Sequence, residues 1–358
     1  MSEPKACILS VSGVTLTDEE RKLLAHANPW GIILMGRSCV GIEQVTALTD
    51  EIRQASGRET LVFIDQEGGR VKRLKPPVWP DFPAPLTYLP IYKADPELGR
   101  EAAWLHHRLM AAELEPMGIR ADCAPVVDLL HPRMHKIVGD RALGETADQV
   151  GDLAQAALAG LAAGGVAGVI KHMPGHGRAE VDSHERLPVV RASREAVEQD
   201  IAPFKLVKHA TMGMTAHLAY AALDDETTPA THSRKIIREV IREEIGFDGL
   251  LMTDDLGMKA LGGTLASRAS RSLEAGCDVV LHCSGLDVWG KILRDAGQVL
   301  REMSEVAEVC PQLSGGQLRR AKAADAATGH LKPFDKAEGR ARLEKLLYGS
   351  PGSSTPAA

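Results

Sequence analysis

Residues 165–184, GVAGVIKHMPGHGRAEVDSH, join an apolar run to a segment rich in ionisable side chains. The run at 165–170 predicts a buried β-strand, because it is short, apolar and contains β-branched residues. Pro174, Gly175 and Gly177 disfavour a helix directly after this strand. Three histidines and a lysine therefore follow the end of a strand, the position at which α/β scaffolds carry their active sites. A polar surface loop with scattered histidines is the alternative interpretation.

Short apolar or β-branched runs recur along the chain, and most are separated by segments rich in Ala, Leu, Glu and Arg. Eight of these runs are expected to be strands: residues 8–13, 31–35, 61–65, 121–128, 166–172, 212–218, 249–254 and 277–283. Helices are expected at 42–54, 97–117, 146–163, 233–245, 265–275, 319–327 and 336–347, and the sequence TDEE at 17–20 predicts a further helix start.

This alternation of strands and helices predicts an α/β fold, a single (β/α)8 TIM-type barrel. A doubly wound open sheet remains the structural alternative, because periodicity does not show that a sheet closes. We expect one catalytic domain over residues 1–340. The end of a C-terminal helix and a disordered tail are expected over 341–358, where the composition becomes simple.

Composition restricts the class of protein. Apolar residues make up 44% of the 358 residues, enough for a large core, and the formal net charge is −6. That charge argues against a nucleic-acid partner, which would need a basic face. No apolar run approaches the length of a membrane span, and the N-terminus does not predict a signal peptide. We therefore expect a cytoplasmic monomer with a small-molecule substrate and with neither a nucleic-acid nor a membrane partner.

Ionisable residues collect at the ends of four predicted strands. Asp65 ends the third strand, Lys171 and His172 end the fifth, His217 ends the sixth and Asp254 ends the seventh. The carboxyl ends of barrel strands meet on one face, which is the catalytic face of such barrels. Charged groups are costly to desolvate, so this collection indicates a functional site rather than packing.

Several motifs occur together in the region from about residue 31 to about residue 283. They are KHMPGHG at 171–177 followed by DSH at 182–184, VIREEIGFDGLLMTDDLG at 240–257, DQEGGRVKR at 65–73, GDR at 139–141 and TAH at 215–217. In this order they resemble glycoside hydrolase family 3, in its peptidoglycan-recycling branch of β-N-acetylglucosaminidases.

The resemblance implies a catalytic set. Asp254 matches the family nucleophile, and strand alternation should direct only one of Asp254 and Asp255 into the pocket. His184 matches the acid/base, with Asp182 as its partner. A histidine can donate and then accept a proton near neutral pH, and a carboxylate two residues away in an extended segment can orient its ring.

The resemblance also implies a sugar-binding set: Asp65, Arg73, Arg141, Lys171 and His172. Asp65 can accept hydrogen bonds from two sugar hydroxyls, and Lys171 can donate one. Arg73 and Arg141 suit a carboxylate on the substrate, such as the lactyl group of muramic acid, although either arginine could instead form a surface ion pair. No cofactor and no metal ion is expected.

The sequence thus predicts a retaining β-N-acetylglucosaminidase that hydrolyses N-acetylglucosaminyl-1,6-anhydro-muramyl peptides in cell-wall recycling. It would act through a covalent glycosyl-Asp intermediate with a His acid/base. A family 3 β-glucosidase and an N-acetylglucosaminide phosphorylase are the alternatives. A metal-dependent barrel hydrolase using His172 and His217 is a more remote one, as is a non-catalytic sugar-binding protein.

Overall fold

The computed structural model describes residues 2–131, 137–179, 183, 186–283 and 295–349. Within these residues, eight parallel strands close into a barrel in the order β1-β10-β9-β7-β5-β4-β3-β2. The barrel strands are β1 (Lys5–Ser10), β2 (Pro29–Leu34), β3 (Leu61–Ile64), β4 (Ala121–Asp122), β5 (Ala167–Met173), β7 (Met212–Thr215), β9 (Leu250–Asp255) and β10 (Val279–Leu281). The predicted barrel is therefore confirmed, with a strand at each of the eight expected positions.

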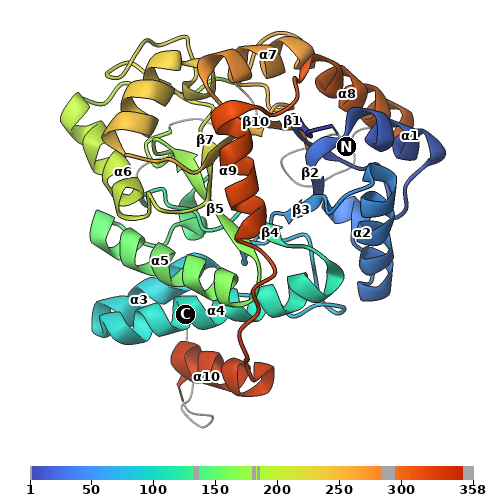
Figure 1. Ribbon diagram of the computed structural model, residues 1–358. Coiled ribbons are helices and arrows are strands. Elements are labelled where there is room, and N and C mark those ends of the chain that lie inside the picture. Colours follow the sequence, from blue (N-terminus) through green and yellow to red (C-terminus); the bar gives the residue numbers. More distant parts are fainter. Residues whose placement is uncertain (1, 132–136, 180–182, 184–185, 284–294, 350–358) are drawn as a thin grey trace.

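A helix follows each barrel strand and lies on the outside of the barrel (Figure 1). This ring consists of α1 (Asp18–Ala27), α2 (Ile42–Ser56), α4 (Pro96–Leu114), α5 (Ala147–Ala163), α6 (Arg194–Leu206), the π-helix η6 (Ile236–Glu244), α7 (Leu265–Ala275) and α8 (Ala296–Val309). The other elements are α3 (Tyr88–Ala94), α9 (Gly315–Ala326), α10 (Lys336–Tyr348), the paired short strands β6 (Val189–Val190) and β8 (Ala219–Tyr220), and the 3-10 helices η1 (Gly36–Ser38), η2 (Pro85–Thr87), η3 (Glu115–Met117), η4 (Gly139–Arg141) and η5 (Ala230–His232).

Local chemistry explains where several elements begin and end. α1 begins with a capping box, in which the Thr17 hydroxyl accepts from the Glu20 amide at 3.1 Å and the Glu20 carboxylate accepts from the Thr17 amide at 2.8 Å. β4 has two residues rather than the eight predicted, because Pro125 has no N–H to donate to a ladder. α6 was not predicted; its interior Pro203 weakens the helical signal.

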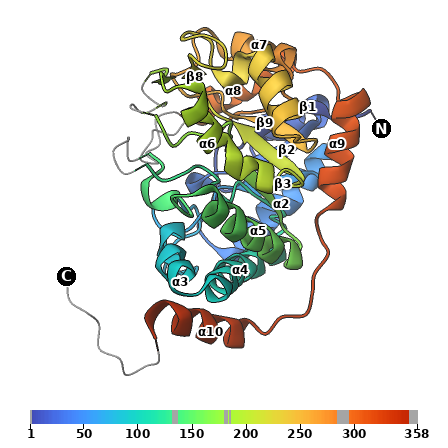
Figure 2. The same ribbon diagram turned by 90° about the vertical axis from the view of Figure 1, so that its left-hand side faces the viewer.

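The strand side chains that point inward form one apolar cluster, which includes Ile8, Phe63, Val169 and Met252. α9 closes this cluster at the end of the barrel from which the strands start. Ala321 and Ala324 of α9 are buried in this cluster together with Trp30 of β2. Figure 2 shows α9 on the side of the barrel where the N-terminus lies, opposite β8.

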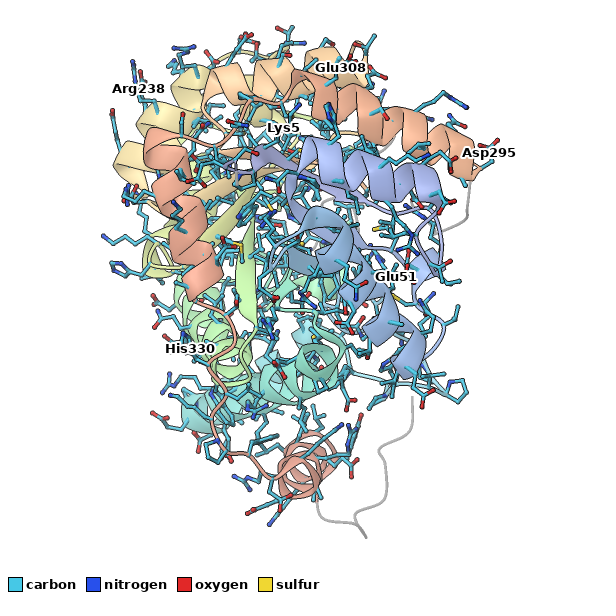
Figure 3. The ribbon with its side chains drawn as sticks, turned by 45° about the vertical axis from the view of Figure 1, so that its right-hand side comes forward. Lys5, Glu51, Arg238, Asp295, Glu308 and His330 are labelled. Carbon is cyan, nitrogen blue, oxygen red and sulfur yellow. The ribbon has the colours of Figure 1, made fainter. Side chains whose placement is uncertain are left out.

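α10 packs against the outside of α4 (Figure 3), and the segment around His330 connects it to α9. Arg342 of α10 pairs with both carboxylate oxygens of Glu101, at 2.8 and 2.6 Å. Just before α10, the ring of Phe334 contacts Trp104 edge to face and lies 4.4 Å from the Arg108 guanidinium. The expected domain boundary at residue 340 falls within α10, and the predicted tail from residue 350 onward lies outside the described residues.

No helix in the described part of the chain combines the length and the apolar character needed to cross a bilayer.

Asp278 joins four elements at the start of β10. Its carboxylate accepts from the Leu251 amide at 2.9 Å, from Arg242 of η6 at 2.7 Å and from Arg320 of α9 at 3.1 Å. Only 3% of its side chain is exposed, whereas Asp248, which also pairs with Arg320, has 65% of its side chain exposed.

We expect Asp278→Ala to lower the free energy of unfolding by about 3 kcal/mol, because it removes the carboxylate that pairs with the partly buried Arg242 guanidinium and leaves the buried Leu251 amide without its acceptor. Asp248→Ala is the matched control, and it should cost about 1 kcal/mol or less, since an exposed ion pair contributes little. Urea unfolding followed by circular dichroism measures both values. Equal losses in the two variants would contradict the role assigned to Asp278.

Candidate active site

Three predicted site residues lie at the carboxyl ends of their strands, next to the inner cluster. Side chains alternate along a strand, and the inner cluster contains, from β3, β5 and β9, Leu61, Phe63, Ala167, Val169, Leu250 and Met252. Continuing this alternation by two residues reaches Asp65 and Lys171. The register between β9 and β10 shifts after Met252, and Asp254 is placed instead by its charge, which acts on the buried Cys123 thiol of the inner cluster and on the rings of His176 and His217. These side chains therefore point toward the barrel axis at the carboxyl ends of the strands, where (β/α)8 enzymes hold their active sites.

An ion cluster links the loop after β3 to strand β5 and to η4. The Lys171 ammonium lies 3.0 Å from Asp65 Oδ1 and 2.6 Å from Glu67 Oε1. The Arg141 guanidinium donates to both oxygens of Glu67 at 2.7 Å, and Arg73 Nη2 donates to Asp65 Oδ2 at 2.9 Å. The structure thus brings together Asp65, Arg73, Arg141 and Lys171, and it adds Glu67.

The charges in this cluster are held in their ionised forms. Burial opposes ionisation of Asp65, but Lys171 and Arg73 outweigh it and hold the pKa of this carboxyl below its usual range. Burial likewise opposes the charge on Lys171, but Asp65 and Glu67 raise the pKa of its ammonium. Three cations face two carboxylates here, which leaves one positive charge in excess. Such a cluster can accept from sugar hydroxyls at Asp65 and donate to them at Lys171.

The loop that carries Asp65 and Glu67 is held by hydrogen bonds between the Gln66 side chain and backbone amides of the same loop. The Gln66 side-chain oxygen accepts from the amides of Arg73 and Leu74 at 2.8 and 3.0 Å. Gly68 has a φ of 94°, and a Cβ there would lie 2.4 Å from the Pro83 carbonyl oxygen, so the turn after Glu67 requires glycine.

Asp122 of β4 also holds this loop in place through a hydrogen bond. Its Oδ1 accepts from the Gln66 amide at 2.9 Å, and the residue is fully buried. Burial raises the pKa of this carboxyl well above its ordinary value. A neutral Asp122 avoids a third negative charge beside Asp65 and Glu67.

His172 is oriented by a buried carboxylate. Its Nδ1 lies 2.7 Å from Asp128 Oδ2, and Asp128 Oδ1 also accepts from the backbone amides of His172 and His176 at 3.2 and 2.6 Å. With Nδ1 bound to Asp128, Nε2 is the ring nitrogen that can contact a ligand. Asp128 ends the apolar run at 121–128, just as Asp65 and Asp254 end their own apolar runs, and this shared position is the signal that could have identified it.

Asp254 and Asp255 have different surroundings. Asp255 Oδ1 accepts from the amides of Gly257 and Cys283 at 3.0 and 2.9 Å and lies 3.4 Å from His282 Nδ1. Burial opposes its ionisation, but the hydrogen bond with His282 and the charge of that ring help to lower its pKa to about 2. Asp255 is therefore bound within the β9–β10 edge, although it does not cap α7, whose N-cap is Thr264.

Asp254 instead faces the mouth of the barrel. Its Oδ1 accepts from the Asp255 amide at 2.7 Å. Its charge acts on the rings of His176 and His217, whose pKa values it raises against the stronger lowering effect of burial. His217 Nε2 in turn donates to the Asp255 carbonyl at 3.0 Å. The two adjacent carboxylates at the end of β9 thus have different surroundings.

Asp182 and His184 lie outside the described residues. Ser183, between them in the sequence, is described and buried. Its carbonyl accepts from the Ala260 amide at 3.1 Å, and its hydroxyl lies 3.5 Å from His176 Nε2. Among the residues that the structure places, no group of three or more His, Cys, Asp or Glu side chains could hold a metal ion.

Burial lowers the pKa of His176 to about 4, and the charge of His172 adds to this effect. A lowered folded-state pKa contributes stability that is present above pH 6.5 and is lost as the pH falls toward 4. We expect wild type to lose about 2 kcal/mol of unfolding free energy through this ring between pH 7.5 and pH 5. His176→Asn should be less pH-sensitive by that amount in urea unfolding at the two pH values.

The exposed His26 provides the matched control, since His26→Asn should keep the wild-type pH dependence. An unchanged pH dependence in His176→Asn would show that the His176 ring does not titrate as stated.

The chain matches a known protein family and is similar to several of its members. Residues 2–309 match the family model of the glycosyl hydrolase family 3 N-terminal domain. The β-hexosaminidase of Alkalilimnicola ehrlichii is 39% identical over 292 residues, which is 80% of this chain and 83% of that protein. The β-hexosaminidase of Bordetella avium is 35% identical over 81% of this chain and 83% of its own length.

Among solved structures, NagZ from Neisseria gonorrhoeae in complex with N-trifluoroacetyl-D-glucosamine superposes with a TM-score of 0.82 at 29% identity. The match covers 97% of this chain and 99% of that chain. α9 and α10 lie beyond the matched family domain. The chain therefore belongs to glycosyl hydrolase family 3 and is a glycoside hydrolase.

Proposed function

We propose that this enzyme is a retaining β-N-acetylglucosaminidase that removes a terminal N-acetylglucosamine through a covalent intermediate on Asp254. One observation carries the proposal: Asp254 lies at the carboxyl end of β9, and its charge acts on His176 and His217 at the barrel mouth that also holds the Asp65–Lys171 pair. The similarity to proteins named β-hexosaminidase, and to NagZ in complex with an N-acylated glucosamine, supports the choice of sugar.

The sugar would bind to the ion cluster. Asp65 would accept from ring hydroxyls, while the third N–H of Lys171 and Nε2 of His172 would contact the same ring. Arg73 and Arg141 remain in the proposed binding set. Their guanidinium groups already donate to Asp65 and Glu67, so direct contact with a substrate carboxylate would need donors that these pairs leave over.

In the first step, the Asp254 carboxylate would attack the anomeric carbon, and the bond to the leaving oxygen would break as that oxygen takes a proton from the His184 imidazolium. In the second step, neutral His184 would take a proton from water, whose oxygen displaces the Asp254 carboxylate. Asp182 would orient the ring and stabilise its charged form.

The surroundings of Ser183 support the assignment of the acid/base to its neighbour. The Ser183 carbonyl accepts from the backbone amide of Ala260. Ala260 lies in the loop that follows β9, the strand that carries Asp254. The segment from β5 therefore reaches the loop after β9 at residue 183, between Asp182 and His184.

The substrate class that we propose is N-acetylglucosaminyl-1,6-anhydro-muramyl peptides, and the role is cell-wall recycling in the cytoplasm by a monomeric enzyme. The motif set at residues 65–73, 171–184 and 240–257 supports this branch of the family. A phosphorylase differs only in its acceptor, so product analysis with and without inorganic phosphate separates the two: free N-acetylglucosamine in both conditions indicates a hydrolase.

The Asp254 assignment predicts a covalent adduct. Incubation with 5-fluoro-N-acetylglucosaminyl fluoride should label the peptide that contains residue 254, because fluorine destabilises both transition states and slows release of the intermediate. Peptide mass spectrometry identifies the site, and Asp254→Asn should remain unlabelled. A stable adduct on a peptide without residue 254 would refute the assignment.

The His184 assignment predicts a dependence on the leaving group. His184→Ala should slow cleavage of phenyl N-acetylglucosaminide by about 100-fold or more, because this leaving group needs a proton. Cleavage of the 2,4-dinitrophenyl glycoside should fall far less, because that leaving group departs as an anion. Steady-state kinetics of both substrates give the comparison, and equal losses would contradict an acid role.

A further inference from the structure

A buried histidine, His282, directly follows β10. Val279, Leu281 and Cys283 belong to the inner cluster of the barrel, so the alternation along this segment turns His282 to the opposite side, toward the helical layer. His282 is 0% exposed, and its backbone amide donates to the Ile8 carbonyl of β1 at 2.9 Å. The proposed two-step mechanism does not involve this ring, although the ring lies against the end of β9.

Both ring nitrogens of His282 face carboxylates. Nδ1 lies 3.4 Å from Asp255 Oδ1, and Nε2 lies 3.1 Å from Oε2 of Glu302, a buried residue of α8. No closer partner for Nδ1 is found within the described residues. An ionised carboxylate only accepts hydrogen bonds, and a neutral imidazole has a single N–H. Between two ionised carboxylates, only the imidazolium form presents an N–H to each of them.

Asp255 connects this ring to Asp254. The Asp255 carboxylate accepts from the Cys283 amide at 2.9 Å, which fixes the residue against the end of β10. The backbone amide of Asp255 donates to Asp254 Oδ1 at 2.7 Å. A chain of contacts therefore runs from Glu302 through His282 and Asp255 to the carboxylate of Asp254.

Other ionisable groups surround this chain, and a substitution of His282 leaves them in place. Arg37 of η1 donates to the Cys283 carbonyl at 3.2 Å, and Arg268 of α7 donates to the Leu256 carbonyl at 2.7 Å. The remaining groups are Glu20 of α1, which acts on Arg37, and Asp65, Cys123, His176, His217 and Cys283, which lie around Asp254 and Asp255. Removal of the His282 ring therefore tests the charge of that ring alone.

We propose that His282 is a positioning residue for the nucleophile, a buried imidazolium that offsets the charge of Asp255 and holds this residue so that Asp254 stays ionised and aligned. This inference rests on the proposed function, in which Asp254 attacks the anomeric carbon. Two adjacent carboxylates disfavour each other's ionisation, and a cation beside one of them weakens that effect. The interaction is strong here because the ring is buried, where charges are screened less than in water.

The test is the pH dependence of kcat/KM in His282→Gln, with 2,4-dinitrophenyl N-acetyl-β-glucosaminide as substrate. Glutamine keeps an N–H donor but carries no charge. The acid limb of this profile reports the ionisation of the nucleophile in the free enzyme. We expect the limb to move to higher pH by roughly 0.5 to 1 unit, because loss of a nearby positive charge disfavours the ionised carboxylate. A purely structural role would lower the rate without moving the limb.

His107→Gln is the matched control. His107 is a histidine of α4 that is also buried, and its Nδ1 lies 2.8 Å from the Ala103 carbonyl rather than beside a carboxylate. This variant should keep the wild-type acid limb. A wild-type acid limb in His282→Gln would overturn the positioning role and leave the proposed function intact, whereas a wild-type enzyme that cleaves no N-acetylglucosaminide would overturn the proposed function.

A second measurement needs neither turnover nor a variant. Nuclear magnetic resonance of the wild-type protein, labelled with 15N-histidine and assigned through the backbone of residues 281–283, reads the protonation state of the ring. We expect both nitrogens of His282 to carry a proton at about pH 7, where an unperturbed histidine is largely neutral. A neutral His282 ring at this pH would overturn the proposal, whatever the activity of the enzyme.

Discussion

A buried ammonium, that of Lys171, holds the candidate site together. It is 2% exposed and lies between the carboxylates of Asp65 and Glu67, which come from the loop after β3. An unpaired charge at this depth would be strongly unfavourable, so strand β5 and the loop after β3 are constrained to meet. Arg141 donates to both oxygens of Glu67, and Arg73 donates to the Asp65 oxygen that Lys171 does not contact. These ion pairs preorganise the charged groups of the site.

Two adjacent carboxylates at the end of β9 have different surroundings. Asp254 faces the barrel mouth, where its charge acts on His176 and His217, whereas Asp255 is bound by backbone amides and His282. This contrast explains how one short sequence supplies both a site carboxylate and a structural one. The barrel beneath them is closed by α9, so the inner cluster that supports these strand ends is covered at its far end.

The sequence alone determined that eight apolar runs alternate with helical segments, and each run became a strand, but only the tertiary structure showed that the sheet closes into a barrel. The sequence also predicted that Asp65, Lys171 and Asp254 would lie on one face, since the carboxyl ends of parallel strands share one face, and the structure places Asp65 and Lys171 in contact. Only the tertiary structure revealed the roles of Glu67, Asp122 and Asp128. Their partners lie 44 or more residues away along the chain, and no local pattern encodes such pairings. The position of α9 could not be predicted from the sequence either. The sequence predicts a helix there, but only the tertiary structure places Ala321 and Ala324 against the inner cluster of the barrel.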